Sequence, residues 1–181
     1  DPKIKLYCVP FPYTDRDTLG VKQDHGLTLT PCIMNPKSRG DVTIESDNPK
    51  DRPLVNPNFL SNDEDLSLIL DAVKLARKVL KTKPLSDIVI EESLPGEFIK
   101  NDEELKNYCK KMIKTNWHPV GTCKMGTEDD EMSVLNTKLQ VKGIEKLRVF
   151  DVSMMPNIVS ANTNAPAMAI ADKATDLMFE D

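Results

Sequence analysis

The pattern of apolar and polar positions first predicts strands in the N-terminal part of the chain. Residues 3–9 alternate between polar and apolar side chains, which is typical of a half-buried strand. Residues 26–34 predict a second strand that is interrupted at Pro31. Because alternation resumes shortly afterwards, we expect an antiparallel, hairpin-like pair over residues 26–46. Residues 47–58 are rich in proline and aspartate and indicate a solvated connection.

Two later stretches show the apolar spacing of amphipathic helices, with an apolar side chain every three or four residues. The first is expected to begin at Ser61, whose hydroxyl can cap free amides, and to end before Pro84. The second has Asn101 as its N-cap and runs to about Ile113. A third helix, rich in alanine and methionine, is predicted over residues 165–180, with capping side chains ahead of it.

The rest of the pattern is less regular. Residues 87–91 are compatible with a strand or with part of a loop. Two short strands are predicted over residues 134–141 and 147–150, on either side of Gly143. Taken together, the elements predict an α+β protein in which a mostly antiparallel sheet is covered by helices.

Length and charge narrow the classes of protein. With 181 residues the chain can bury a core as one domain, and two small lobes are an open alternative. A formal net charge of −5 argues against non-specific nucleic-acid binding, which needs clustered Lys and Arg. No apolar run approaches the roughly 20 residues that span a bilayer, so no transmembrane segment is predicted. The localisation stays open, with secretion as one alternative.

Cysteines and histidines do not indicate a metal site. No two cysteines have the C-x-x-C spacing of zinc or thioredoxin-type motifs, and the two histidines lie far apart. Disulfides, in a secreted protein, and free buried thiols are both open alternatives. The four cysteines are Cys8, Cys32, Cys109 and Cys123.

His118 is the most informative single residue. It follows a predicted helix that ends near Ile113, and it precedes Pro119, which disfavours a helical conformation at the residue before it. Gly121 and Gly126 then permit tight backbone paths. An imidazole at such a helix-to-loop junction can exchange a proton with a group that faces the loop. The alternative is a structural histidine with satisfied hydrogen bonds.

Three ordered motifs resemble those of a known family. They read CIMNPKSRGDVTI at residues 32–44, HPVGTCKMG at residues 118–126, and RVFDVSMMP followed by SANTNAPAMAIADKA within residues 148–174. Together they resemble the C-terminal part of the glucose–methanol–choline (GMC) oxidoreductases, and the first contains the family's P-x-S-x-G stretch. The resemblance covers nearly the whole chain. Within the family, the sequence is most similar to animal glucose dehydrogenase (FAD, quinone)-like proteins.

This resemblance implies an FAD-dependent oxidoreductase acting on CH–OH groups of alcohols or sugars, with oxygen or a quinone as electron acceptor. The family carries a dinucleotide-binding G-x-G-x-x-G motif near its N-terminus, and none of the seven glycines here has that spacing. We therefore expect the C-terminal part of a longer flavoenzyme, which by itself binds FAD poorly and is inactive. Residues 1–115 would then form the substrate-binding domain. Residues 116–181 would form an active-site segment and a C-terminal helix that pack toward the FAD domain.

Two residues carry the implied chemistry. Flavin takes a hydride from the substrate carbon, so the protein must accept the proton of the substrate hydroxyl. The motif places His118 as general base, because a neutral imidazole with a pKa of about 6.5 suits proton transfer near neutral pH. The family's second polar residue, a His or an Asn, falls on Asn162, with Asn164 as the alternative if the alignment shifts by two. Asn162 would hold the hydroxyl, because an amide cannot take the proton.

The resemblance also implies contacts to the cofactor. The helix after Asn164 directs the positive end of its dipole toward the electron-rich edge of a reduced flavin. Asp151 would approach FAD, and the alternative is that it caps a turn. Trp117 lines a flavin or substrate wall, or belongs to an ordinary core. Ala161 and Val152 differ from the smaller residues that the family often has. The implied cofactor-binding set is Trp117, Asp151, Val152, Asn162, Thr163 and Asn164, and no metal is implied.

Two other functions are weighed against this one. A catalytically inactive binding or scaffold module could keep the fold without depending on His118. An NAD-linked dehydrogenase is disfavoured, because the dinucleotide motif is missing. Replacing His118 in the full-length enzyme separates catalysis from the inactive alternative.

Overall fold

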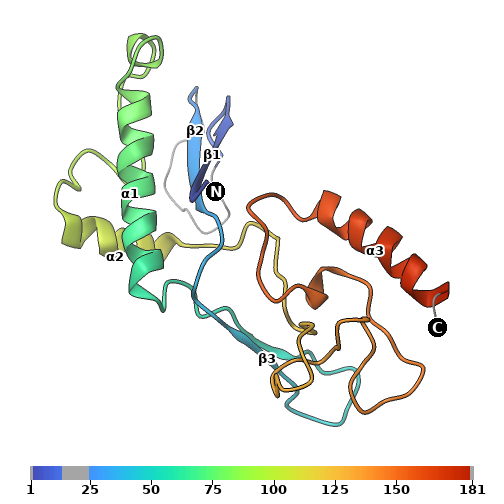
Figure 1. Ribbon diagram of the computed structural model, residues 1–181. Helices are drawn as coiled ribbons and strands as arrows, with labels where there is room; N and C mark the ends of the chain where they lie inside the picture. Colours follow the sequence, from blue (N-terminus) through green and yellow to red (C-terminus); the bar gives the residue numbers. More distant parts are fainter. Residues whose placement is uncertain (1, 14–24, 180–181) are drawn as a thin grey trace. The chain divides into compact units, whose positions relative to one another are not determined.

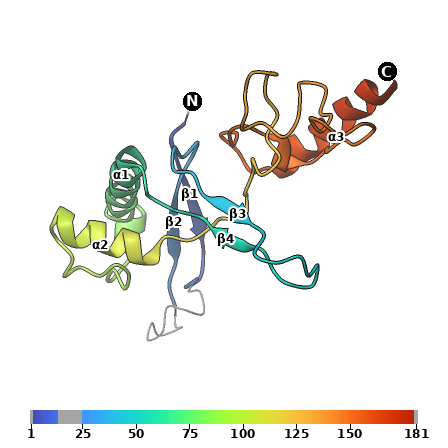
Figure 2. The same cartoon turned by 90° about the horizontal axis from the view of Figure 1, so that it is seen from below.

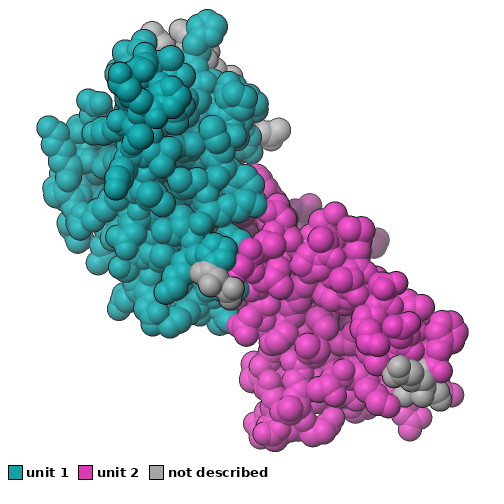
Figure 3. Space-filling model, turned by 45° about the horizontal axis from the view of Figure 1, so that its top comes forward, with its two compact units in different colours: residues 1–39, 58–114 teal, residues 40–57, 115–181 magenta. Residues whose placement is uncertain are grey.

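The computed structural model describes residues 2–13 and 25–179, and the chain divides into two compact units. Unit 1 comprises residues 1–39 and 58–114, and unit 2 comprises residues 40–57 and 115–181 (Figure 3). Each unit has its own cluster of buried apolar side chains. The chain therefore enters unit 2 twice, and the sequence pattern did not predict that residues 40–57 belong with the C-terminal part. The roles expected for residues 1–115 and 116–181 stay predictions.

Unit 1 contains a two-stranded antiparallel sheet that lies beside the long helix α1 (Figure 1). Strand β1 (Ile4–Val9) pairs with β2 (Thr28–Ile33), and Leu6 lies opposite Pro31. The strand predicted at residues 3–9 is confirmed. The predicted interruption at Pro31 is wrong, because in a two-stranded sheet each strand has an unpaired edge at which proline is tolerated.

Both helices predicted in unit 1 are confirmed. Helix α1 (Asp63–Leu80) begins after Asn62, whose side-chain oxygen accepts a hydrogen bond from the Glu64 amide at 2.9 Å. The predicted cap at Ser61 is therefore wrong by one residue. Helix α2 (Asp102–Met112) begins after Asn101, as predicted. In both helices acidic residues fill the first turn, where the positive end of the helix dipole stabilises them.

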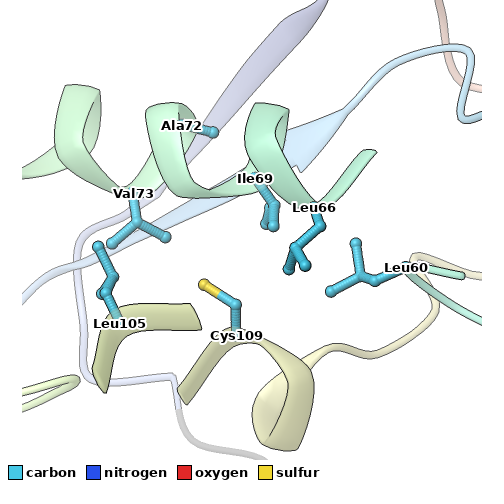
Figure 4. Packing of buried hydrophobic residues seen from close by; sticks show 7 residues of the cluster. All are labelled: Leu60, Leu66, Ile69, Ala72, Val73, Leu105 and Cys109. Atoms are coloured by element: carbon cyan, nitrogen blue, oxygen red, sulfur yellow. The ribbon is translucent and has the colours of Figure 1, made fainter. Parts of the chain in front are cut away.

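The core of unit 1 lies between the apolar faces of α1 and α2. Figure 4 shows the buried side chains of these two faces pointing toward one another. The spacing of three and four residues brings the apolar positions of each helix onto one side. Burying each large aliphatic side chain contributes about 1.5–3 kcal/mol. The cluster consists of Leu60, Leu66, Ile69, Ala72, Val73, Leu105 and Cys109.

The P-x-S-x-G stretch of the first motif is attached to α1 through Asp65, whose side chain is only 3% exposed. Its two carboxylate oxygens accept hydrogen bonds from the Lys37 amide at 2.9 Å and the Ser38 amide at 2.6 Å. The Ser38 hydroxyl donates to the same carboxylate. Burial by itself would raise the pKa of Asp65, but these hydrogen bonds outweigh it and hold the pKa below its ordinary value. Lys37 and Ser38 of this motif therefore have a structural role within unit 1.

Residues 87–91, for which the sequence left two alternatives, form a loop. The short 3₁₀ helix η1 (Leu85–Asp87) ends at the first of these residues, and the Val89 amide donates back to the Leu85 carbonyl at 3.0 Å. The Ile90 side chain is 97% exposed, whereas Val89 is half-buried.

Unit 2 begins with a short hairpin, which Figure 2 shows clearly. Strand β3 (Asp41–Thr43) pairs with β4 (Leu54–Asn56), so that Val42 lies opposite Val55. The hairpin predicted over residues 26–46 is therefore wrong, because β2 pairs with β1 and β3 pairs with β4. The backbones approach so closely at Gly40 that an added Cβ would lie 2.1 Å from the Asn56 carbonyl oxygen. Only glycine fits there.

The remainder of unit 2 is mostly irregular. The strands predicted over residues 134–141 and 147–150 are replaced by isolated bridges such as Leu135 with Val141. The cause is a turn at Asn136, whose side-chain oxygen accepts the amide hydrogens of Lys138 and Gln140 and bends the chain. A second core gathers around this turn and consists of Leu135, Leu139, Met154, Met155 and Ala174.

The third predicted helix is present as α3 (Asn164–Phe179), and Glu180 at its predicted end lies outside the described residues. The α+β class and the antiparallel pairing of the strands are confirmed. Among the described residues, no helix has both the length and the apolar character needed to cross a bilayer. The four cysteines are present as free thiols.

Candidate active site

His118 lies in a loop with an unusual backbone. Helix α2 ends at Met112, and Trp117 adopts a φ of +57°, which is rare for a bulky side chain. The Trp117 amide donates a hydrogen bond to the Thr115 hydroxyl oxygen at 3.0 Å, which stabilises this turn. The indole of Trp117 is 67% exposed, so the alternative that it belongs to an ordinary core is wrong for the described residues.

The loop that follows His118 is joined to the first part of the third motif, RVFDVSMMP, by backbone hydrogen bonds. The Cys123 amide donates to the Ser153 carbonyl at 3.0 Å, and the Met125 amide donates to the Met154 carbonyl at 2.8 Å. Gly121 adopts a φ of +91°, which allows the chain to turn into this pairing. Residues about 30 positions apart in the sequence are therefore held side by side.

Asp151 caps the short 3₁₀ helix η2 (Val152–Met154). Its side-chain oxygen accepts a hydrogen bond from the Ser153 amide at 2.7 Å, and its side chain is exposed. Val152 is half-buried and packs against the core of unit 2. The turn-cap alternative for Asp151 is thus realised, and contacts of Asp151 and Val152 with FAD remain a prediction.

The third motif reaches His118 through Thr163. The imidazole Nδ1 of His118 and the hydroxyl oxygen of Thr163 share a hydrogen bond of 3.0 Å, across 45 positions in the sequence. Thr163 is 8% exposed, and its carbonyl accepts the amide hydrogen of Ala167 in the first turn of α3. Asn162 and Asn164 flank Thr163 and are both exposed. All three stretches that carry candidate residues in unit 2 are therefore joined by hydrogen bonds.

This arrangement combines groups of three chemical kinds. His118 is half-buried and can accept or donate a proton. Asn162 and Asn164 offer amide donors and acceptors that cannot take a proton. The N-terminal end of α3 adds partial positive charge. No cluster of three or more His, Cys, Asp or Glu side chains suited to a metal occurs in residues 2–13 and 25–179.

The bond between His118 and Thr163 was not foreseen from the sequence, although Thr163 was named as a cofactor-binding residue. One signal was available. A threonine three positions before Pro166 indicates a helix N-cap. Because proline has no amide hydrogen, the threonine hydroxyl there lacks one of its usual donors. Which distant group that hydroxyl would meet could not be read from local sequence.

Comparisons with known proteins agree with this arrangement of motifs. The family model described as GMC oxidoreductase matches residues 36–171. The chain belongs to the GMC oxidoreductase family. Alcohol dehydrogenase [acceptor] of Pseudomonas putida is 39% identical over 177 residues, which cover 98% of this GMC chain and 32% of that relative. Choline oxidase of Arthrobacter globiformis is 36% identical over 157 residues, covering 86% of this chain and 29% of the relative.

Solved structures lead to the same family. Pyridoxine 4-oxidase from Mesorbium loti superposes with a TM-score of 0.90 at 26% identity, covering 99% of this chain and 35% of that one. Formate oxidase from Aspergillus oryzae RIB40, in a structure on FAD modification, superposes with a TM-score of 0.83 at 26% identity. The match covers 98% of this chain and 31% of the formate oxidase chain. This GMC chain thus spans about a third of the length of the relatives that it matches. The branch of glucose dehydrogenase-like proteins remains a prediction.

Proposed function

We propose that this chain supplies the proton-transferring side of the active site in an FAD-dependent oxidoreductase acting on CH–OH groups of alcohols or sugars. In this proposal His118 is the general base, and Asn162 holds the substrate hydroxyl. Membership of the GMC family and relatives named as alcohol dehydrogenase and choline oxidase support the substrate class.

One observation carries the proposal. The 3.0 Å hydrogen bond between His118 and Thr163 ties a half-buried imidazole to the residue adjacent to Asn162. Thr163 is buried and begins a helix, so its position is well defined. A base and a hydrogen-bonding carboxamide are thereby drawn from two distant stretches of sequence into one neighbourhood, as oxidation of an alcohol requires.

The chemical character of the described residues suits the binding of FAD. The N-terminal end of α3 suits the negatively charged edge of a reduced isoalloxazine, and Asn162 and Asn164 present exposed amides at that end. Trp117 presents an exposed indole that can line a flat ring or a substrate. When bound, FAD supplies the hydride-accepting chemistry. We assign the remaining contacts to Asp151, Val152 and Thr163.

The contribution of His118 is to accept the hydroxyl proton of the alcohol as the C–H bond is oxidised to a carbonyl. General-base assistance of this kind raises rates by about 10²–10⁴-fold. Asn162 contributes orientation, because an amide that bonds the hydroxyl oxygen limits the directions in which the C–H bond can point. The electron acceptor is oxygen or a quinone, and comparing oxygen uptake with quinone reduction identifies which.

Most of the FAD site is proposed to lie outside these 181 residues, because the sequence lacks a G-x-G-x-x-G motif. The isolated chain should therefore bind FAD poorly and show little activity. A purified 181-residue preparation that is yellow and oxidises alcohols would contradict this part of the proposal.

The test of the base is His118→Gln in the flavin-loaded protein. We expect kcat to fall by about 10²–10⁴-fold while the flavin content, measured by absorbance, is unchanged. His25→Gln is the matched control, because His25 is the other histidine of the chain and is exposed. Turnover that survives His118→Gln would contradict a catalytic role for His118 and favour a structural role for this arrangement of residues.

A further inference from the structure

We propose that Thr163 is a positioning residue that holds His118 in the tautomer with the hydrogen on Nδ1. In that tautomer Nε2 carries the free lone pair and is the nitrogen that accepts the substrate proton. The proposal deepens the function proposed above and rests on His118 being the base.

The contact itself supplies the first part of the argument. The Thr163 hydroxyl lies 3.0 Å from Nδ1, so Nδ1 is engaged in a hydrogen bond with the protein. Thr163 is only 8% exposed, so water cannot readily replace this bond. Losing a hydrogen bond between buried polar groups costs about 1–3 kcal/mol, so this bond fixes the orientation of the ring.

The start of α3 leaves the hydroxyl oxygen able to accept a hydrogen bond from Nδ1. The Thr163 carbonyl accepts the Ala167 amide hydrogen, which places Thr163 at the N-cap of the helix. An N-cap hydroxyl normally accepts from the amide two or three positions later. Pro166 occupies the third position and has no amide hydrogen. Within the described residues, the hydrogen bond recorded for this hydroxyl is the one to His118.

The direction of the bond matters for the proton transfer. With Nδ1–H donating to Thr163, the O–H bond of the alcohol breaks and its proton moves to Nε2, which leaves an imidazolium with two N–H groups. The Nδ1–H group donates to Thr163 both before and after this step, so the hydroxyl need not rotate. With the opposite tautomer Nε2 would already carry a hydrogen and could not act as a base.

The tautomer can be measured directly by NMR of ¹⁵N-labelled histidine. The His118 signal is identified by its loss in His118→Gln, and His25→Gln removes the signal of the other histidine in these 181 residues. We expect the neutral His118 ring to carry its hydrogen on Nδ1. Thr163→Val, which keeps the shape but removes the hydroxyl, should shift the population toward Nε2–H, and Thr163→Ser should restore it. A wild-type ring with its hydrogen on Nε2 overturns the proposal without any variant.

Turnover provides the second readout. In the flavin-loaded protein Thr163→Val should lower kcat by about tenfold with little change in KM, and Thr163→Ser should recover most of the loss. Wild-type kcat in Thr163→Val, together with a severe loss in His118→Gln, would overturn the positioning role and leave the proposed function intact. Wild-type kcat in His118→Gln would instead remove the proposed function itself.

Discussion

The two units build their cores in different ways. In unit 1 the core lies between two regular helices, α1 (Asp63–Leu80) and α2 (Asp102–Met112). In unit 2 much of the core is covered by loops, which isolated bridges and backbone hydrogen bonds hold together. All the candidate site residues, from Trp117 to Asn164, lie in unit 2.

This difference shows how the molecule separates packing from chemistry. Regular helices satisfy their backbone groups locally and present a predictable apolar face. Irregular segments leave side chains free to point in directions that a helix or strand does not allow, and functional residues concentrate in such segments for that reason. In unit 2 the loops still have fixed positions, because hydrogen bonds such as that between Cys123 and Ser153 tie them together.

The largest change in stability is expected when a cavity is created in either core. Leu66→Ala in unit 1 and Leu135→Ala in unit 2 should each lower the free energy of unfolding by about 2–5 kcal/mol, because both side chains are buried. Chemical denaturation measures the loss. Leu75→Ala is the control, because Leu75 on α1 is 40% exposed and should lose much less.

The single tryptophan, Trp117, sharpens this test, because it lies in unit 2. The unfolding transition followed by Trp117 fluorescence should shift more in Leu135→Ala than in Leu66→Ala. The transition followed by the circular-dichroism signal of the helices should shift more in Leu66→Ala. Equal shifts of both signals in both variants would mean that the two cores do not differ in the way described.

A smaller effect is expected at Asp65, where unit 1 depends on a buried carboxylate. Asp65→Asn should lower the free energy of unfolding by about 1.5–3 kcal/mol, because the amide group cannot accept all the hydrogen bonds from Lys37 and Ser38. Asp63→Asn in the same helical turn is the control, since Asp63 is exposed. Urea titrations of the three proteins give the comparison.

The pH dependence of this loss has a definite sign. The folded pKa of Asp65 lies below its ordinary value, so its contribution to stability is fully present above the unfolded pKa of about 3.9. It disappears as the pH falls through the lower, folded value. The difference between wild type and Asp65→Asn should therefore shrink in acid, and a difference that grows in acid would exclude this role for the carboxylate.

The smallest expected effect is at Asp151 in unit 2. Asp151→Ala removes the cap of η2 and should cost about 1 kcal/mol in thermal or chemical unfolding. Asp151→Ser keeps a capping oxygen without the charge and should retain most of the stability. Comparing the flavin affinity of the two variants shows whether the carboxylate also contacts the cofactor, since only a direct contact would weaken binding in both.

Much of unit 1 could be predicted from the sequence, and less of unit 2. The helix that ends before Pro84 and the cap at Asn101 follow from spacing and side-chain chemistry within a few residues. The strands expected at residues 134–141 failed because the turn at Asn136 competes locally with extended structure. The partner of β2 was also missed, since alternation shows that a strand exists but not which strand it pairs with.

Short stretches of sequence were enough to predict the helices, the α+β class, the family motifs and the residue types on which the chemistry depends. These are properties of short stretches, in which periodicity and capping act between neighbouring residues. The tertiary structure alone decided that Asp65 binds the P-x-S-x-G stretch and that Thr163 meets His118 across 45 positions. Such contacts depend on how packed elements bring distant backbone segments together, and no local pattern encodes that distance.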